Sequence, residues 1–296
     1  MIDNPLISPY FIAEVSSNHH RDLERCLNFI DKSAEIGCDA VKFQLFKIDK
    51  LFAPEILDVS EHHRKRSEWE LPTSFLPELT KRCHEKGIQF SCTPFYIEAV
   101  EELLPYVDFY KIASYELLWD ELLIACAKTG KPVVLSTGMA TLDEISHAVT
   151  ILKKAGCDAP VLLHCVSGYP TPVEQCNLAA IETIRNALKC QVGWSDHSVS
   201  PVVLNRAMGH WDAQVIEFHL DLDKHGEEYG AGHCWLPEQI APVIRNIRES
   251  FSADGTGIKS PVDVEMDDRE WRADPVDGLR PMQSIRKKFV LSHTKT

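Results

Sequence analysis

Two lysines interrupt apolar, strand-like runs of this sequence. Lys42 and Lys111 each stand near the carboxyl end of such a run. Lysine is rarely buried without a partner, so each could pair with a carboxylate such as Glu14 or Glu116. The two ammonium groups could instead clamp a phosphate, or one desolvated lysine could form a Schiff base with a carbonyl substrate.

Small hydroxyl side chains follow the same kind of run at several places. A serine or threonine often ends a strand or caps a helix, so one of them alone predicts little. Several hydroxyl donors beside two lysines suit a phosphate or a carboxylate. The candidates are Ser91, Thr93, Ser114, Ser136, Thr137, Ser167 and Ser195.

His197 and His219 end two runs that are consecutive in the sequence. On adjacent strands their imidazoles would lie side by side and could share one metal ion, whereas a single histidine is more often a hydrogen-bonded wall residue. His164 is a third candidate. Because the spacing requires no further protein ligand, such an ion would stay open to water and substrate, as catalytic ions do.

Glu14 and Glu116 are the carboxylates nearest to these polar positions. Either could act as a general base or accept a hydrogen bond from a substrate hydroxyl. The structural interpretation is a salt bridge to one of the lysines. Both interpretations predict that the two carboxylates face the same space as the lysines.

Eight β-branched or apolar runs end in these polar residues, and most are separated by stretches with helical periodicity. A strand and a helix repeated eight times predict a (β/α)8 TIM barrel of the α/β class, with its site at the carboxyl ends of the strands. The runs are 11–16, 40–44, 89–93, 109–114, 133–137, 161–167, 192–197 and 215–219.

The length of 296 residues exceeds the roughly 250 residues of a single barrel. We expect residues 1–251 to form the catalytic barrel. Residues 252–296 should form an extended arm, because this tail is too short and too polar for a core of its own. Residues 47–71 are irregular and rich in charged residues and histidine. A long loop of that kind is a candidate lid over the barrel.

The formal net charge is −13, which argues against broad nucleic-acid binding because such binding needs a basic surface. No apolar run approaches the roughly 18 residues that span a bilayer, so we expect no membrane insertion. Residues 1–5 show no signal-peptide core, and the ten cysteines form no C-x-x-C pair. These features predict a cytoplasmic protein with reduced thiols.

Eight motifs, one at each strand and in the right order, resemble the sialic acid synthase (N-acetylneuraminate synthase) family. The resemblance covers residues 10–250, and the ordered set is far more specific than any single motif. The motifs are Ile12-Ala13-Glu14 with Asn18-His19, Ala40-Val41-Lys42-Phe43-Gln44, Cys92-Thr93-Pro94-Phe95, Tyr110-Lys111-Ile112-Ala113-Ser114-Tyr115-Glu116, Leu135-Ser136-Thr137-Gly138-Met139-Ala140, Leu163-His164-Cys165 with Tyr169-Pro170-Thr171-Pro172, Ser195-Asp196-His197 and Glu217-Phe218-His219.

The resemblance implies a condensation that depends on phosphoenolpyruvate (PEP). C3 of PEP adds to the aldehyde of an open-chain aldose, commonly N-acetylmannosamine, water adds at C2, and phosphate leaves. The product is a 2-keto-3-deoxy sugar acid. The resemblance also implies that His197 and His219 bind Mn²⁺ or Mg²⁺, which polarises the aldehyde, and that the enzyme is a homodimer.

The resemblance further implies roles for the residues at the strand ends. Glu116 would act on the reacting carbons together with Glu14 and Lys111, which favours the lysine clamp over the Schiff base. Glu14, Gln44 and Tyr169 would hold the hydroxyls of the acceptor sugar. PEP would be held by Lys42, Thr93, Lys111, Ser114, Ser136, Ser167 and Ser195.

The sequence departs from the family on the acceptor side. Family members usually end in an antifreeze-like domain, whose arginine contacts the acceptor's N-acyl group in the partner subunit, and we expect this chain to lack it. Gly232 stands where the family usually has Asp, and Ser167 where many members have Asn. We therefore expect either a different acceptor from N-acetylmannosamine or a replacement group from residues 272–281, supplied by Arg280.

Two other functions are open at this point. A class I aldolase would use Lys42 or Lys111 in a Schiff base that borohydride traps, and EDTA would not inhibit it. A catalytically silent barrel would serve as a binding subunit and would release no phosphate from PEP.

Overall fold

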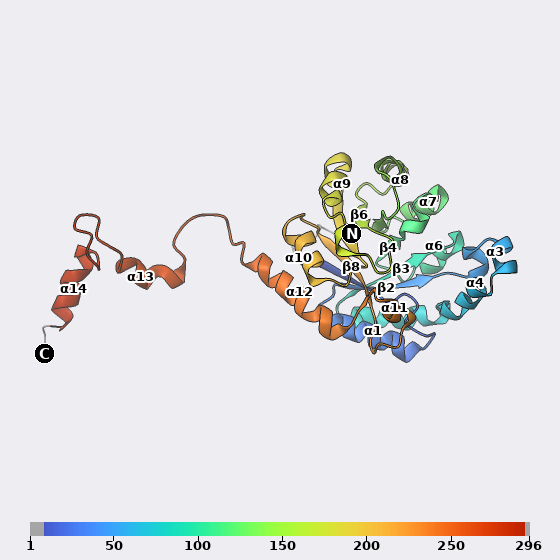
Figure 1. Ribbon diagram of the computed structural model, residues 1–296, viewed down its shortest axis with the longest axis horizontal. Coiled ribbons are helices and arrows are strands. Elements are labelled where there is room, and N and C mark those ends of the chain that lie inside the picture. Colours follow the sequence, from blue (N-terminus) through green and yellow to red (C-terminus); the bar gives the residue numbers. More distant parts are fainter. Residues whose placement is uncertain (1–8, 294–296) are drawn as a thin grey trace. The chain divides into compact units, whose positions relative to one another are not determined.

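Eight parallel strands close into a barrel in the computed structural model, which describes residues 9–293. The strands pair in sequence order, and the last pairs with the first. This confirms the predicted (β/α)8 barrel (Figure 1). The strands are β1 (Tyr10–Glu14), β2 (Ala40–Leu45), β3 (Gln89–Pro94), β4 (Phe109–Ile112), β5 (Val133–Ser136), β6 (Val161–Cys165), β7 (Gln191–Asp196) and β8 (Val215–Leu220).

Helices alternate with the strands and cover the outside of the barrel (Figure 1). Their ends follow local capping rules: α8, for example, begins at a reciprocal capping box between Thr141 and Glu144. The main helices are α1 (Leu23–Glu35), α5 (Leu76–Glu85), α6 (Ile97–Leu103), α7 (Asp120–Lys128), α8 (Leu142–Lys154), α9 (Ala180–Leu188), α10 (Pro201–Gly209) and α12 (Pro237–Ser252).

The side chains that face the barrel interior change from apolar to polar along each strand. An apolar cluster of Ile12, Ala40, Phe109, Val134, Leu163 and Val215 fills the interior at one level. Side chains of a strand alternate between its two faces, so the residues two positions further along also face inward. These residues are Glu14, Lys42, Lys111, Ser136, Cys165 and Glu217. The apolar cluster thus closes the barrel beneath a polar layer at the carboxyl ends.

Residues 47–71, the lid segment, form a series of short helices instead of the irregular chain that we expected. Pro54 occupies the first turn of its helix, where a missing backbone N–H costs no hydrogen bond. The Ser60 hydroxyl accepts a hydrogen bond from the backbone N–H of His63 and caps the next helix. The elements are α2 (Ile48–Leu51), α3 (Pro54–Val59), α4 (Glu61–Lys65) and η1 (Arg66–Trp69).

A short ninth strand, β9 (Cys234–Trp235), pairs in parallel with β8 and was not predicted. The helix α11 (Glu227–Ala231) precedes it and ends at Gly232, whose φ of +94° is a left-handed conformation that favours glycine. The pairing brings the residues between β8 and β9 to the carboxyl end of the barrel. Three further short helices are η2 (Thr73–Phe75), η3 (Ser114–Glu116) and η4 (Val173–Gln175).

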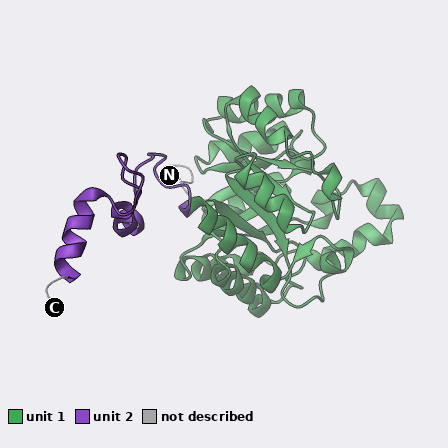
Figure 2. Ribbon diagram, turned by 60° about the vertical axis from the view of Figure 1, so that its left-hand side comes forward, with its two compact units in different colours: residues 1–251 green, residues 252–296 purple. Residues whose placement is uncertain are grey.

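The chain divides into two compact units, Met1–Phe251 and Ser252–Thr296 (Figure 2). The second unit contains η5 (Asp263–Glu265), α13 (Met266–Glu270) and α14 (Gln283–His293), which the sequence pattern did not predict. Within residues 9–293, no helix is long and apolar enough to cross a membrane. Residues 1–5, which we searched for a signal peptide, lie outside the described residues.

Candidate active site

A cavity of about 740 Å³ opens at the carboxyl ends of the strands and collects most of the predicted site residues. Its volume is typical of a small-molecule site. Thr93 and Ser167 do not line it, and Arg280 belongs to the second unit. The predicted residues that line the cavity are Glu14, Lys42, Gln44, Lys111, Ser114, Glu116, Ser136, Tyr169, Ser195, His197 and His219.

Three of the sequence candidates are bound to backbone carbonyl oxygens instead. Ser91 donates a hydrogen bond to the carbonyl oxygen of Phe109 at 2.9 Å, and Thr137 to that of Leu163 at 3.1 Å. Nε2 of His164 lies 3.0 Å from the carbonyl oxygen of Cys176. These side chains therefore stabilise the barrel wall.

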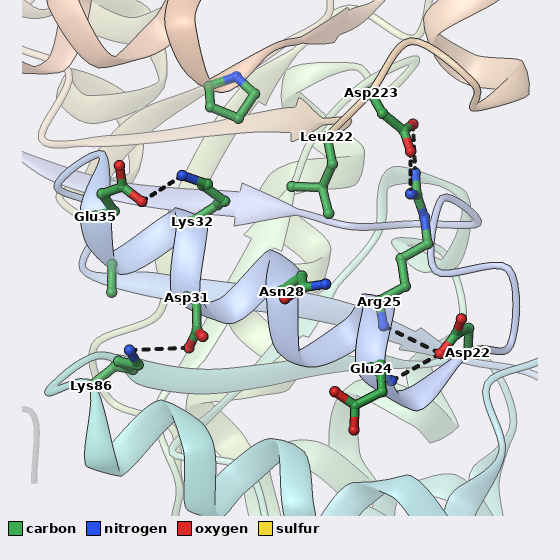
Figure 3. A pocket seen from close by; sticks show the side chains of 12 residues that line it. Asp22, Glu24, Arg25, Asn28, Asp31, Lys32, Glu35, Lys86, Leu222 and Asp223 are labelled. Carbon is green, nitrogen blue, oxygen red and sulfur yellow. Dashed lines mark hydrogen bonds and ion pairs between the residues drawn. The ribbon is translucent and has the colours of Figure 1, made fainter.

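A larger hollow of about 1000 Å³ lies along α1 and shares no lining residue with this cavity (Figure 3). It is open, and charged side chains line most of it. Mutual ion pairs leave it little capacity to bind a ligand. Its cations are all paired: Arg25 with Asp221 and Asp223, Lys32 with Glu35, and Lys86 with Asp31.

Two buried lysines and two buried glutamates form the floor of the barrel cavity. Lys42 forms an ion pair with Glu14 and donates a hydrogen bond to the Thr93 hydroxyl at 3.2 Å. Nζ of Lys111 lies 3.0 Å from Oε1 of Glu217, whose other oxygen lies 4.0 Å from Nζ of Lys42. Burial acts to lower the pKa of Lys42, but Glu14 and Glu217 outweigh burial and raise it.

Glu217 is a site residue that our sequence analysis quoted within a motif but gave no role. Burial acts to raise the pKa of its carboxyl group, whereas Lys111 and Lys42 lower it and prevail. The sequence could have predicted this position. Glu217 lies two positions before His219 on the same strand, so both side chains face the same side of that strand.

Two serine hydroxyls near this floor are buried and have no hydrogen-bond partner within the described residues: those of Ser136 and Ser167. Ser114 accepts a hydrogen bond from the backbone N–H of Gly138 at 2.9 Å, and Ser195 donates one to Glu217 at 3.1 Å. A buried polar group without a partner costs about 1–3 kcal/mol. Ser136 lines the cavity, so its free hydroxyl can bond to a ligand there.

Glu116 lies in η3, directly after β4, and its Oε2 is buried without a hydrogen-bond partner among the described residues. Burial raises the pKa of Glu116 to about 8, although the positive charge of Lys111 opposes the shift. The group is therefore largely protonated at neutral pH. A neutral carboxylic acid beside a lysine can donate a proton to a substrate oxygen.

His197 and His219 lie side by side, with ring centroids 5.2 Å apart. Nδ1 of His197 lies 2.8 Å from the carbonyl oxygen of Val166, and Nδ1 of His219 lies 2.7 Å from a carboxylate oxygen of Glu228. Metal-binding histidines generally hold their second nitrogen in such bonds. Among the described residues no hydrogen bond is formed to either Nε2 atom, so the pair fits a shared divalent ion.

The pKa values of the two histidines move in opposite directions. Burial lowers the pKa of His197 to about 3, so its ring is neutral and can act as a ligand. Burial also acts to lower the pKa of His219, but the carboxylate of Glu228 outweighs burial and raises it.

Glu228, on α11, is the second site residue that we missed. It accepts hydrogen bonds from the Ser16 hydroxyl and from Nδ1 of His219. With His219, His233 and Cys234 it forms a group whose possible ligand atoms all lie within 4.8 Å of one another. No sequence period predicts its position, because α11 is a helix of only 5 residues in the connection after β8.

The acceptor side predicted from the sequence lies around Glu14, Gln44 and Tyr169. The Gln44 amide donates hydrogen bonds to Glu14 at 2.7 Å and to the Ser16 hydroxyl at 3.1 Å. The Tyr169 ring packs against His197, with centroids 4.2 Å apart. Polar and aromatic groups are thus combined here, as is usual in small-molecule sites.

A parallel barrel with buried lysine–glutamate pairs and a histidine pair at its mouth defines an enzyme site for anionic, oxygen-rich substrates. Residues 29–259 match the model of the NeuB family, and the chain belongs to this family. The resemblance stated from the sequence motifs is confirmed. Like its relatives, which are named synthases, the chain is an enzyme that forms a C–C bond with a sugar.

Named synthases are among the similar proteins. The N,N'-diacetyllegionaminic acid synthase of Legionella pneumophila is 32% identical over 87% of this chain and 76% of its own length. The pseudaminic acid synthase of Campylobacter jejuni is 32% identical over 84% of this chain and 75% of its own. The structure of a sialic acid synthetase from Leptospira borgpetersenii has a TM-score of 0.76 at 30% identity, covering 91% of this chain and 92% of that chain.

Proposed function

We propose that this enzyme condenses PEP with an N-acyl aldose, such as N-acetylmannosamine or a related sugar, and releases phosphate. The product would be a 2-keto-3-deoxy sugar acid of the sialic-acid type. One observation supports this most directly: two buried lysines, Lys42 and Lys111, line one cavity with the unpartnered hydroxyl of Ser136. An anion with many oxygens, such as PEP, would satisfy these donors.

In this proposal the polar layer holds PEP, and neither lysine forms a Schiff base. A Schiff base needs an uncharged, nucleophilic amine, whereas Lys42 is ion-paired with a raised pKa and Lys111 is paired with Glu217. Charged lysines suit a phosphate or carboxylate instead. The PEP-binding set would be Lys42, Thr93, Lys111, Ser114, Ser136, Ser167 and Ser195.

Glu116 would move the protons of the reaction, with Glu14 and Lys111 in supporting roles. As C3 of PEP bonds to the aldehyde carbon, the neutral Glu116 donates its proton to the aldehyde oxygen. Water then adds at C2 and gives one proton back to the Glu116 carboxylate. The C2–O bond to phosphate breaks as the ketone forms, and the second proton of the water leaves with the phosphate. Glu14 would keep Lys42 charged throughout.

The histidine pair would hold a divalent ion, Mn²⁺ or Mg²⁺. When bound, such an ion polarises the aldehyde carbonyl as a Lewis acid. His197 and His219 would present Nε2 to it, and Glu228 would hold the His219 ring in place through its bond to Nδ1.

Glu14, Gln44 and Tyr169 would bind the hydroxyls of the acceptor. Gly232 contributes no carboxylate, but Glu227 and Glu228 line the same cavity and could replace it. Arg280, in the second unit, remains a prediction for the acceptor's remaining group. If Arg280 contributes, Arg280→Ala will raise the acceptor KM, and unchanged KM and kcat would contradict that role. A homodimer and a cytoplasmic location likewise remain predictions from the sequence.

The decisive experiment is a phosphate-release assay with PEP, Mn²⁺ and a panel of N-acyl and neutral aldoses. We expect phosphate release to be fastest with an N-acyl aldose and slower with a neutral aldose such as mannose, and to be lost with EDTA or in Lys42→Met. Covalent trapping by borohydride would support the aldolase. Absence of phosphate with every aldose would refute the synthase and favour the silent barrel.

A further inference from the structure

Arg66 places a positive charge in the outer wall of the cavity. It begins η1 in the lid segment and lines the cavity. Its Nε is buried and has no hydrogen-bond partner among the described residues. Its guanidinium carbon lies 5.6 Å from the ring centre of Phe52 and 5.3 Å from that of Trp69. Two aromatic rings therefore orient the group.

Arg66 differs from the other cations of the cavity because it is not neutralised. Within residues 9–293 it forms no ion pair, whereas Lys42 and Lys111 are both paired with glutamates. The lid segment itself is anchored: Arg21 donates a hydrogen bond to the carbonyl oxygen of Ser67 at 3.1 Å, and Glu70 accepts one from the backbone of Ile48 at 2.7 Å. A fixed, unpaired guanidinium has donors ready for a ligand.

Phe52 and Trp69 flank Arg66, and further apolar side chains line the same cavity. Phe46 and Phe95 pack edge to face with ring centroids 6.2 Å apart, and they line the cavity together with Leu51, Phe52 and Trp69. A small acyl amide suits this wall, because its methyl group can pack on the rings while its carbonyl oxygen accepts from the guanidinium. A hydrated phosphate dianion would lose much of its solvation there.

We propose that Arg66 and the aromatic wall of the lid segment form the subsite for the N-acyl group of the acceptor sugar, an inference that rests on the proposed function. Arg66 is then a specificity-determining residue supplied by the barrel's own lid segment. The subsite requires nothing from the second unit.

The test compares Arg66→Met with Arg66→Lys and with the control Lys65→Met, which removes an exposed neighbouring charge that does not line the cavity. Turnover is measured with N-acetylmannosamine and with mannose, which has a hydroxyl in place of the acetamido group. We expect Arg66→Met to lower kcat/KM for N-acetylmannosamine roughly 10- to 100-fold, with the rate for mannose and the KM for PEP unchanged. Arg66→Lys should recover only part of the loss, because it lacks the planar fork.

Equal losses with both sugars would overturn the proposal, as would a selective loss with the 6-phosphate of N-acetylmannosamine. Calorimetric binding of the unreactive alditols, N-acetylmannosaminitol and mannitol, separates this inference from the proposed function. If the native protein releases no phosphate but binds N-acetylmannosaminitol in a manner that depends on Arg66, the synthase proposal fails and the subsite stands. Equal binding of both alditols overturns the subsite itself.

Discussion

At the scale of single residues, Glu116 is the group whose protonation state should control the rate. Its pKa is raised to about 8 by burial, so the proton-donating form is lost as the pH rises through about 8. We expect kcat/KM to fall above that pH, because kcat/KM reports the pKa values of the ligand-free enzyme. Glu116→Gln cannot transfer a proton, so it should lower kcat by roughly 10²–10⁴-fold without changing the KM for PEP. The measurement is a pH–rate profile, and the same alkaline limb in the variant would contradict the assignment.

Glu228 should control metal affinity through His219. Removal of the carboxylate that holds a metal-binding histidine typically weakens metal binding by roughly 10–100-fold. We expect Glu228→Gln to show that loss in a Mn²⁺ titration followed by electron paramagnetic resonance, without any substrate. Glu227→Gln is the matched control, because Glu227 also lines the cavity but has no bond to His219. Equal losses in both variants would disprove the positioning role.

The sequence was sufficient to predict those site residues that lie at the carboxyl ends of strands. Lys42 and Lys111 interrupt apolar runs, and the polar ends of consecutive parallel strands must meet at one end of a barrel. Glu217 follows the same rule and could have been assigned from its spacing to His219. Glu228 and Arg66 lie in connecting segments with no period, where only the folded structure determines which way each side chain points.

At the scale of elements, the turn after β5 brings a glycine against two serines of the proposed PEP site. A Cβ added at Gly138 would lie 2.4 Å from Oγ of Ser167 and 2.9 Å from Oγ of Ser114. We therefore expect Gly138→Ala to displace one or both hydroxyls and to raise the KM for PEP in steady-state assays. Gly209→Ala, at the end of α10 with open space around it, should leave that KM unchanged. A normal KM in Gly138→Ala would show that PEP does not need these hydroxyls.

In the lid segment, capping residues start helices where the composition of the sequence predicts only a polar loop. Pro54 and Ser60 start two short helices there. Neither helix has an apolar stripe long enough to be recognised by periodicity. Prediction of the segment as irregular was therefore wrong, although its place at the cavity was anticipated.

At the scale of the whole molecule, the repeat of eight strand–helix units made the barrel predictable. The alternation of strand and helix patterns can be recognised even though the individual residues differ from unit to unit. The second unit has no repeat, and its short helices depend on local contacts such as the carboxylate of Asp274, which accepts a hydrogen bond from the backbone N–H of Gln283 at 2.9 Å. Such contacts leave little trace in a hydrophobic pattern.

The two lysine–glutamate pairs have a consequence for the charge balance of ligand binding in this acidic molecule. Lys42 and Lys111 are cancelled by Glu14 and Glu217 before any ligand arrives. A multiply charged anion that binds beside these pairs adds negative charge that no cation compensates. Nearby groups should therefore take up protons from the solvent when the anion binds. In a calorimetric titration with PEP, the heat of binding should therefore depend on the ionisation enthalpy of the buffer. The sign of this dependence should correspond to net proton uptake by the protein. Identical heats in all buffers would show that no protons are taken up with the anion, which would contradict this expectation. If protons are taken up, PEP should bind more weakly at high pH. The cause would be the neutralised lysine charges of the empty enzyme and not the titration of Glu116.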